Sequence, residues 1–181
     1  MKAEEVGEFF DFIQALGAEG IIVSLGYRYA RASQREMFLH RAYSKRLFRE
    51  IFKVGKGRKW KFNQSSLFLD FLAGNQSYQC TPWGNPTRNA LGWQRPCYLL
   101  AEGYASSFQA LMEETDWARY GPGRHPQCTH CMLHSGFEAT AVEDTLAHPL
   151  KALSVSLRGP GTEGPFAPDL AESQSEAGFE S

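Results

Sequence analysis

The four cysteines of the chain are the residues whose type and spacing point most directly to chemistry. They are Cys80, Cys97, Cys128 and Cys131, spaced as C-x11-G-x4-C, then a long gap, then C-x2-C. Prolines and glycines crowd the stretch between the first two, which predicts turns there and no helix. Turns can aim two sulfurs at one point, and a C-x2-C pair does so by itself. Four converging thiolates form a tetrahedral sulfur site, which suits zinc or an iron–sulfur cluster.

Two other interpretations of these cysteines compete with a metal site. Free cysteines often pack as small apolar side chains, but all four lie in one window of the sequence. A disulfide framework is disfavoured because the N-terminal sequence does not resemble a secretory signal, and four cysteines are sparse for a stapled domain. A metal or cluster site is therefore favoured. The spacing alone leaves zinc and iron–sulfur open.

Composition limits the class of protein. The 181 residues suit one domain or a domain with a tail, and 43% hydrophobic residues suffice for a sizeable core. A net charge of −1 gives no indication of a nucleic-acid partner. We expect a cytoplasmic protein. Eight Lys or Arg between Lys45 and Lys61, against Glu50, are expected to form a solvated helix face, with peripheral membrane contact as an alternative.

The elements around the cysteines are predicted from hydrophobic periodicity. The N-terminal part reads as helix 4–16, buried strand 20–26, helix 34–54 and strand 59–64, an α/β pattern with a parallel sheet. After the second strand, Ser65 or Ser66 is expected to cap a helix over 67–73. Asn63 and Gln64 end that strand, where ligands bind in parallel α/β folds.

The second half is expected to be less regular. It reads as strand 98–100, helix 104–116, a loop that delivers Cys128, helix 137–148, a short turn through Leu157 and a disordered tail over 159–181. The apolar side chains Phe68, Phe71, Trp83 and Trp93 are expected to belong to the core, with the lining of a substrate cavity as the alternative.

Several stretches resemble a known family. FNQSSLFLDFLAGN (62–75), CTPWGNPTRN (80–89), GWQRPCYLL (92–100), MEETDW (112–117) and CTHCMLHSGFEATAV (128–142) are similar to the hopanoid-biosynthesis radical-SAM family HpnH, the adenosylhopane synthases. The cysteine spacing resembles the SPASM/twitch extension of radical-SAM enzymes. The similarity runs from about residue 5 to 165.

The resemblance implies a fold, a reaction and partners. The chain would hold the last strand–helix units of a partial (β/α)6 radical-SAM barrel over 1–79 and a small α+β cysteine-rich extension over 80–158. The extension would bind an auxiliary 4Fe–4S cluster through Cys80, Cys97, Cys128 and Cys131. The implied reaction adds the 5′-deoxyadenosyl group of S-adenosylmethionine to diploptene, a hydrophobic polycyclic alkene. Arg88 and Arg95 are candidates for cations beside the cluster.

The chain also departs from the family. The C-x3-C-x2-C motif that binds the radical-generating cluster is absent, so only the C-terminal half is represented, and we expect an N-terminal radical-SAM half as partner. The chain alone is not expected to cleave S-adenosylmethionine, and its catalytic residues stay unassigned. Ser135 stands where the family usually has a cysteine. The alternative is a four-cysteine zinc module without catalysis, with His130 and His134 as substitute ligands.

Overall fold

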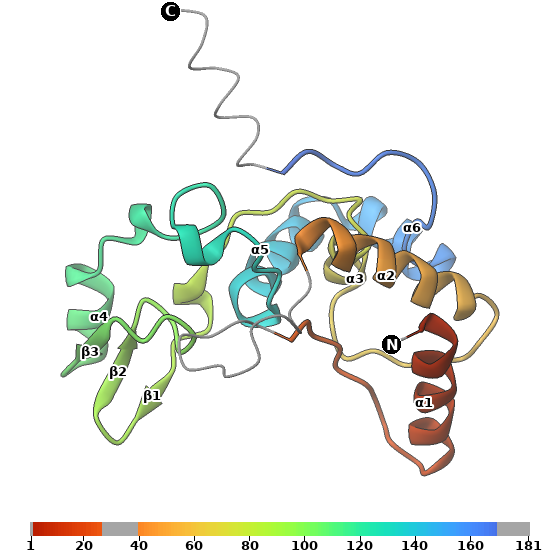
Figure 1. The fold of residues 1–181 in the computed structure, drawn as a ribbon, viewed down its shortest axis with the longest axis horizontal. Helices are drawn as coiled ribbons and strands as arrows, with labels where there is room; N and C mark the ends of the chain where they lie inside the picture. The colour runs from red at the N-terminus through yellow and green to blue at the C-terminus, as the bar shows by residue number, and fades with distance from the viewer. Residues whose placement is uncertain (1, 27–39, 170–181) are drawn as a thin grey trace, which may run out of the picture. The chain divides into compact units, whose positions relative to one another are not determined.

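The computed structural model describes residues 2–26 and 40–169. Its helices and strands are α1 (Ala3–Ala15), α2 (Arg41–Val54), α3 (Ser66–Leu72), η2 (Pro82–Gly84), β1 (Arg88–Asn89), β2 (Gly92–Arg95), β3 (Gly103–Ala105), α4 (Phe108–Glu114), η3 (Trp117–Arg119), η4 (Pro126–Cys128), α5 (His134–Ala147) and α6 (Pro149–Arg158) (Figure 1). No helix in these residues is long and apolar enough to cross a membrane.

The chain divides into two compact units. Unit 1 contains the described residues of 1–24, 42–78 and 141–167, and unit 2 those of 25–41, 79–140 and 168–181. All four cysteines belong to unit 2. Residues 141–158, which the sequence analysis grouped with the cysteine-rich extension, pack in unit 1 instead.

Unit 1 begins with a helix and a short parallel pairing. The Glu5 carboxylate accepts the Lys2 N–H at the start of α1, and Gly17 follows its end at φ +86°. Ile21 then pairs in parallel with Phe62, through N–O hydrogen bonds of 2.8 Å from Ile21 to Lys61 and 3.0 Å from Asn63 to Ile21. The two predicted strands therefore meet, over a single bridge, in the parallel direction that the sequence indicates. A (β/α)6 barrel remains a prediction.

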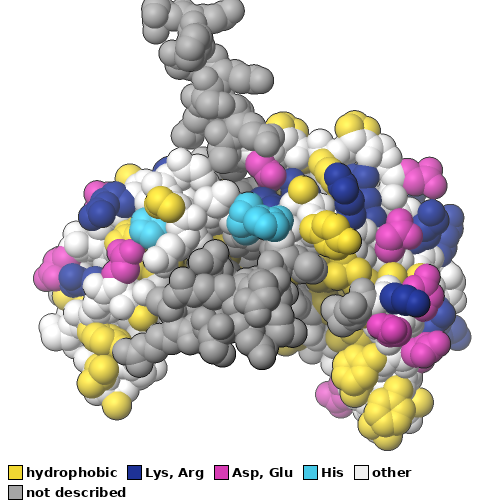
Figure 2. All heavy atoms as spheres, viewed as in Figure 1, with side chains coloured by type: hydrophobic (Ala, Val, Ile, Leu, Met, Phe, Trp, Pro, Cys, Tyr) yellow, Lys and Arg dark blue, Asp and Glu magenta, His cyan; other side chains and the backbone are white. Residues whose placement is uncertain are grey.

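The core of unit 1 comes mainly from α2 and α3. Phe68, Phe71, Leu67 and Leu72 are completely buried, and Phe48, Ile51 and Phe52 of α2 are buried with them. Ser65 caps α3 as predicted, because its hydroxyl accepts the Phe68 N–H at 3.2 Å. On α1, Phe9, Phe12 and Leu16 remain exposed, and Figure 2 shows hydrophobic side chains over this helix at the lower right.

The basic face of α2 differs from its prediction. Lys45 and Arg49 are 3% and 8% exposed, so they do not belong to a solvated surface. The Arg49 guanidinium donates to the Ala73 carbonyl at 2.8 Å and to the Gly164 carbonyl at 2.6 Å, and it stacks on the Phe166 ring at 4.2 Å. Residues 159–167 are therefore packed on unit 1 and are not a disordered tail. The predicted tail beyond 169 and the helix start over 34–39 lie outside the described residues.

Unit 2 is built on a small antiparallel sheet in the order β1-β2-β3, with Trp93 paired to Ala105 and Asn89 to Gly92. Gly92, the glycine of C-x11-G-x4-C, has φ +134°, and a Cβ there would lie 2.7 Å from the Ala105 carbonyl oxygen. Only glycine fits this position. This sheet was not predicted from the sequence. The strand predicted over 98–100 is wrong, because the chain forms a turn there.

Candidate metal centre

Four short segments of unit 2 carry the cysteines. Cys80 lies just before η2, Cys97 follows β2, Cys128 ends η4, and Cys131 lies three residues before α5. Cys128 and Cys131 are buried, and Cys80 and Cys97 are partly buried. All four are free thiols. Between Cys80 and Cys97, where turns and no helix are predicted, the structure has one short 3-10 helix, η2, and the paired strands β1 and β2.

Cys80 packs closely against the first turn of α5. A Cβ added at Gly136 would lie 2.8 Å from the Cys80 sulfur, which is closer than real Cβ contacts. The Thr81 N–H donates to the Gly136 carbonyl at 2.6 Å and holds this approach. Gly136 is therefore required for the position of the Cys80 sulfur.

Backbone N–H groups are directed at three of the sulfurs. Leu99 and Leu100 donate to Cys97, Gly121 donates to Cys128, and Leu133 donates to Cys131. Hydrogen bonds to a thiolate stabilise its negative charge and lower the pKa of the thiol. Burial nevertheless outweighs these donors and leaves the pKa of all three thiols raised.

The thiols also affect one another electrostatically. Burial is the largest cause that raises the pKa of Cys80, and repulsion from the Cys131, Cys128 and Cys97 sulfurs raises it further. Burial likewise raises the pKa of Cys131 to about 12, with contributions from Cys128 and Cys97. The four sulfurs therefore share one region of unit 2. At neutral pH they are protonated unless a cation binds them.

Two arginines supply positive charge near this region. Arg124 lowers the pKa of Cys80 and Cys128, and Arg41 lowers that of Cys131 and donates to the Cys131 carbonyl at 2.6 Å. The predicted cations Arg88 and Arg95 lie elsewhere in their local structure: Arg88 is exposed on β1, and Arg95 pairs with Glu114 at 2.5 Å. Arg124 and Arg41 are far in sequence from the first cysteine pair, so spacing gave no signal for them.

The donor set fits a soft cation. Four thiols, N–H donors at three sulfurs and two nearby guanidinium groups match the needs of zinc or of a 4Fe–4S cluster. Among the described residues, no three His, Cys, Asp or Glu side chains already stand at ligand distances. Binding would have to draw the sulfurs together and release their protons.

The predicted substitute ligands have other partners. His130 lies 2.8 Å from His40, between Nε2 and Nδ1, with the two rings perpendicular. His134 Nε2 lies 4.0 Å from the Glu138 carboxylate. Ser135, where the resembling family has a cysteine, is partly buried in the first turn of α5 beside Gly136.

The remaining candidate residues have structural roles. Phe68 and Phe71 are fully buried, as expected for core residues. The core prediction is wrong for Trp83, which is 38% exposed and packs on Trp117. Trp93 is partly buried and packs on Phe108. None of the predicted four lines the cavity described next. The Gln64 side chain bonds the N–H and carbonyl of Val23 at 2.8 and 2.7 Å, and so completes the strand pairing.

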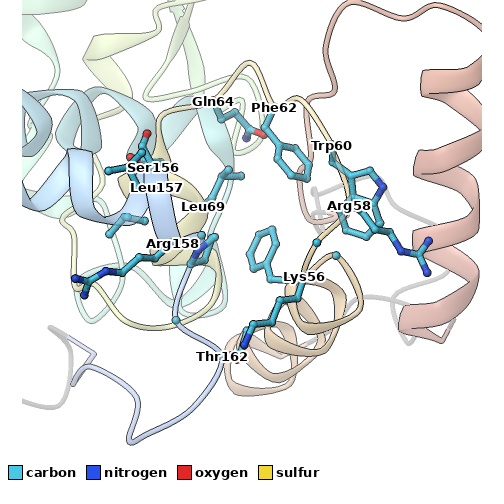
Figure 3. Close-up of a pocket in the computed structure, with 18 residues that line it drawn as sticks. Lys56, Arg58, Trp60, Phe62, Gln64, Leu69, Ser156, Leu157, Arg158 and Thr162 are labelled. Carbon is cyan, nitrogen blue, oxygen red and sulfur yellow. The ribbon is translucent and has the colours of Figure 1, made fainter.

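Unit 1 contains a partly open cavity of about 650 Å³ between the end of α2, the segment around Trp60 and the end of α6. Phe52, Phe62 and Leu69 form its apolar lining. In Figure 3 the guanidinium of Arg58 turns toward α1, where it pairs with Asp11, and that of Arg158 points outward. Lys56 and Arg158 lie at the C-terminal ends of helices, where cations offset the partial negative charge. The cations around this cavity are therefore explained by an ion pair and by helix ends.

Comparison with known proteins gives one match. The family model described as Domain of unknown function (DUF3463) matches residues 21–155, most of both units. No curated protein and no solved structure matches the chain significantly.

Proposed function

The chain belongs to the family described as Domain of unknown function (DUF3463), and we propose that its four cysteines hold a 4Fe–4S cluster. We further propose that the chain is the C-terminal part of a radical-SAM adenosyltransferase of hopanoid biosynthesis. The observation that supports the cluster is the gathering of four thiols in unit 2, three of them with backbone N–H donors. The adenosyltransferase rests on the sequence resemblance alone.

The roles of the chain's own residues follow from this proposal. A bound cluster would supply one-electron redox chemistry or structural support. The cysteines would bind it as thiolates, and the Leu99, Gly121 and Leu133 N–H groups would delocalise their charge. Arg124 and Arg41 would offset the net negative charge of the centre, which raises a reduction potential. Diploptene and S-adenosylmethionine would bind to the complete enzyme, in which an N-terminal radical-SAM half complements this chain.

The second candidate is a zinc module without catalysis. Leu99 donates to Cys97 and Leu133 to Cys131, in each case from two residues after the cysteine. Such a local N–H donor suits a zinc thiolate equally well, because zinc also takes four sulfurs in a tetrahedron.

Metal analysis separates the two. The full chain is purified without oxygen and offered iron with sulfide, or zinc. We expect about four iron atoms per chain and a broad sulfide-to-iron absorption band. Cys97→Ala should remove most of the iron, whereas the control Ser135→Ala, which removes no thiol, should keep it. Stoichiometric zinc with no iron would favour the zinc module, and retention of neither metal would contradict both proposals.

Gly136→Ala tests the site independently of the ligands. Alanine favours a helix over glycine by about 1 kcal/mol, so α5 itself should be stabilised. The added Cβ would nevertheless displace the Cys80 sulfur. We expect metal content to fall while the helical circular-dichroism signal is kept. Full metal content in this variant would mean that Cys80 is not a ligand.

The radical step is tested by product analysis. The chain lacks C-x3-C-x2-C, so the reduced, reconstituted chain should release no 5′-deoxyadenosine from S-adenosylmethionine. Release above the enzyme-free background would show that the radical site lies in this chain. Adding an N-terminal radical-SAM half from the resembling family should restore the reaction with diploptene. If that mixture stays inactive with the cluster in place, the adenosyltransferase proposal fails.

A further inference from the structure

Glu102 connects the segment that carries Cys97 with the loop that carries Cys128. One oxygen of its carboxylate accepts the Tyr120 hydroxyl at 2.7 Å, and the other lies 3.1 Å from Nε2 of His125. The Glu102 N–H also donates to the Arg95 carbonyl at 2.9 Å, which fixes its own backbone beside β2. The Glu102 side chain thus contacts residues at both ends of the loop that leads to Cys128.

The hydrogen bonds define the proton positions in this group. The Gln127 N–H donates to Nδ1 of His125 at 3.3 Å, so this nitrogen is an acceptor. Nε2 of His125 is then the nitrogen that faces the Glu102 carboxylate, 3.1 Å away. The carboxylate therefore accepts a hydrogen bond from the Tyr120 hydroxyl on one oxygen and contacts the His125 ring with the other.

The same residues pack directly on two cysteines. Tyr120, Leu100 and Cys128 form a buried cluster, and Cys97 packs against it. The Tyr120 and His125 rings lie 5.5 Å apart between centroids. The connection between the two segments therefore combines the Tyr120–Glu102 hydrogen bond with direct packing on Cys97 and Cys128.

We propose that Glu102 is a positioning residue of the metal centre, which holds the Cys128 loop against the Cys97 segment so that both sulfurs reach one metal ion or cluster. The inference rests on the proposed metal binding by the cysteines, and it holds for zinc and for iron–sulfur alike. No residue pattern in the sequence connects Glu102 to the cysteines. Only the fold brings it there.

Charge and geometry act in opposite directions at this residue, which makes the inference testable. The negative charge of Glu102 lies beside the cluster that contains Cys128 and Cys97, so by itself it disfavours negative thiolates there. If charge were its whole influence, any neutral replacement would strengthen metal binding. If it positions the loops, a neutral replacement strengthens or preserves binding only when it keeps the contacts with both Tyr120 and His125.

Glu102→Gln and Glu102→Ala separate these effects. A glutamine oxygen can accept the His125 proton while its NH₂ group donates to the Tyr120 oxygen, whose hydroxyl can rotate. Glutamine therefore keeps the bridge and removes the charge, whereas alanine removes both. The matched control is Glu113→Ala on α4 of the same unit, where the exposed carboxylate accepts a hydrogen bond from Gln109.

The experiment titrates the reduced full chain with Co²⁺, whose thiolate charge-transfer and d–d bands report the number and geometry of sulfur ligands, and then displaces it with Zn²⁺. We expect Glu102→Ala to weaken binding about 10- to 100-fold, the usual effect of losing an outer-shell partner, and to change the d–d bands. Glu102→Gln and Glu113→Ala should bind as tightly as the unmodified chain or more tightly. Tyr120→Phe removes only the hydroxyl that bonds Glu102, so it should weaken metal binding less than Glu102→Ala. A graded loss across these two variants would show that the effect comes from the Glu102 contacts and not from misfolding of Glu102→Ala.

Each result decides the question. Unchanged affinity and bands in Glu102→Ala would overturn the positioning role, and equal losses in Glu102→Gln and Glu102→Ala would show a need for charge instead. An unmodified chain that binds neither Co²⁺ nor Zn²⁺ would overturn the proposed metal centre itself. That outcome is distinct from a bound metal that ignores Glu102.

Discussion

Units 1 and 2 are stabilised by different means. In unit 1, the completely buried Phe68, Phe71, Leu67 and Leu72 pack with three further buried side chains of α2, so hydrophobic burial is extensive. In unit 2, the strands are two to four residues long, and the fully buried side chains Leu111, Met132 and Phe137 lie on or next to α4 and α5. Two further buried side chains of unit 2 are the cysteines Cys128 and Cys131. Under the proposed metal binding, part of the interior of unit 2 would therefore depend on what its cysteines hold, whereas unit 1 contains no cysteine.

If the proposed metal centre is present, removal of the metal should have the largest effect, and that effect should differ between the two units. Structural metal binding contributes about 10–16 kcal/mol in small domains, so chelation should unfold unit 2 and spare unit 1. In hydrogen-exchange mass spectrometry, we expect amide protection in 79–140 to fall on the order of a hundredfold or more, with little change in 42–78. Equal loss in both segments would contradict the independence of unit 1.

Phe71→Ala should lower the stability of unit 1 and leave unit 2 unaffected. Truncation of a fully buried phenylalanine costs about 3–5 kcal/mol, and Phe71 also packs on Tyr78 at 5.4 Å between ring centroids. Unit 1 should unfold at lower urea concentration while the folded variant keeps its metal. The control Phe12→Ala, at a side chain 58% exposed, should change stability by less than about 0.5 kcal/mol.

Arg49→Met should release a local segment. The substitution keeps much of the aliphatic volume and removes the donors to the Ala73 and Gly164 carbonyls. We expect the packing of 159–167 to weaken by about 2–3 kcal/mol. Limited proteolysis should then cut this segment first. The control is Lys53→Met at an exposed position of the same helix, which should leave the cleavage pattern unchanged. If the control also exposes 159–167 to cleavage, the added apolar side chain, and not the loss of the Arg49 hydrogen bonds, explains the effect.

The smallest effect is expected from Asp144 and its pH dependence. Burial raises the pKa of Asp144, but hydrogen bonds from Lys151, Tyr78 and His148 outweigh it and hold the pKa below its ordinary value. A depressed pKa means that the ionised form stabilises the fold above the unfolded-state pKa of about 3.9. This contribution is lost as pH falls through the folded-state pKa.

Asp144→Asn should therefore cost about 1 kcal/mol at pH 7 and nothing once the pH lies below both pKa values. Urea titrations of unit 1 at neutral and acidic pH measure the difference. Glu143→Gln, at the exposed neighbouring position, should show no such dependence. A constant cost of the Asp144 substitution at all pH values would mean that shape, and not charge, is what the network requires.

The sequence predicted the parts of the fold that periodicity or capping determines. The helices over 4–16, 67–73 and 137–148 correspond to α1, α3 and α5 within a few residues. Hydrophobic periodicity failed to predict structure that depends on strand pairing or on contacts between residues distant in the sequence. The sheet β1-β2-β3 lies in a stretch of turn-forming residues, and the segment 159–167 has a loop composition but is fixed by Arg49 and Phe166. α6 was expected to be a turn because of Pro149, although proline is favoured in the first turn of a helix.

For the candidate site, the cysteines could be found from the sequence, but the residues that surround them in the fold could not. The four cysteines could be grouped from spacing because few other functions explain such a cluster. Arg124, Arg41 and Glu102 could not, because arginine and glutamate are common on any surface and these three are close to the sulfurs only after folding. Gly136 could in principle be noticed in the sequence, because glycine is an unfavourable residue within a helix. Its contact with the Cys80 sulfur explains why glycine stands there.

The order of the segments in unit 1 has a consequence for synthesis. Its last part, 141–167, is separated from 42–78 by all of 79–140, and Tyr78 is bonded to Asp144 at 2.5 Å where the chain returns. Unit 1 therefore cannot be completed until the ribosome has released the whole cysteine-bearing insertion. During that interval α3 lacks its partner α6, and apolar surface is open to chaperones and to other nascent chains. Acquisition of the metal by the insertion would shorten the interval, since a compact insert brings its two ends together.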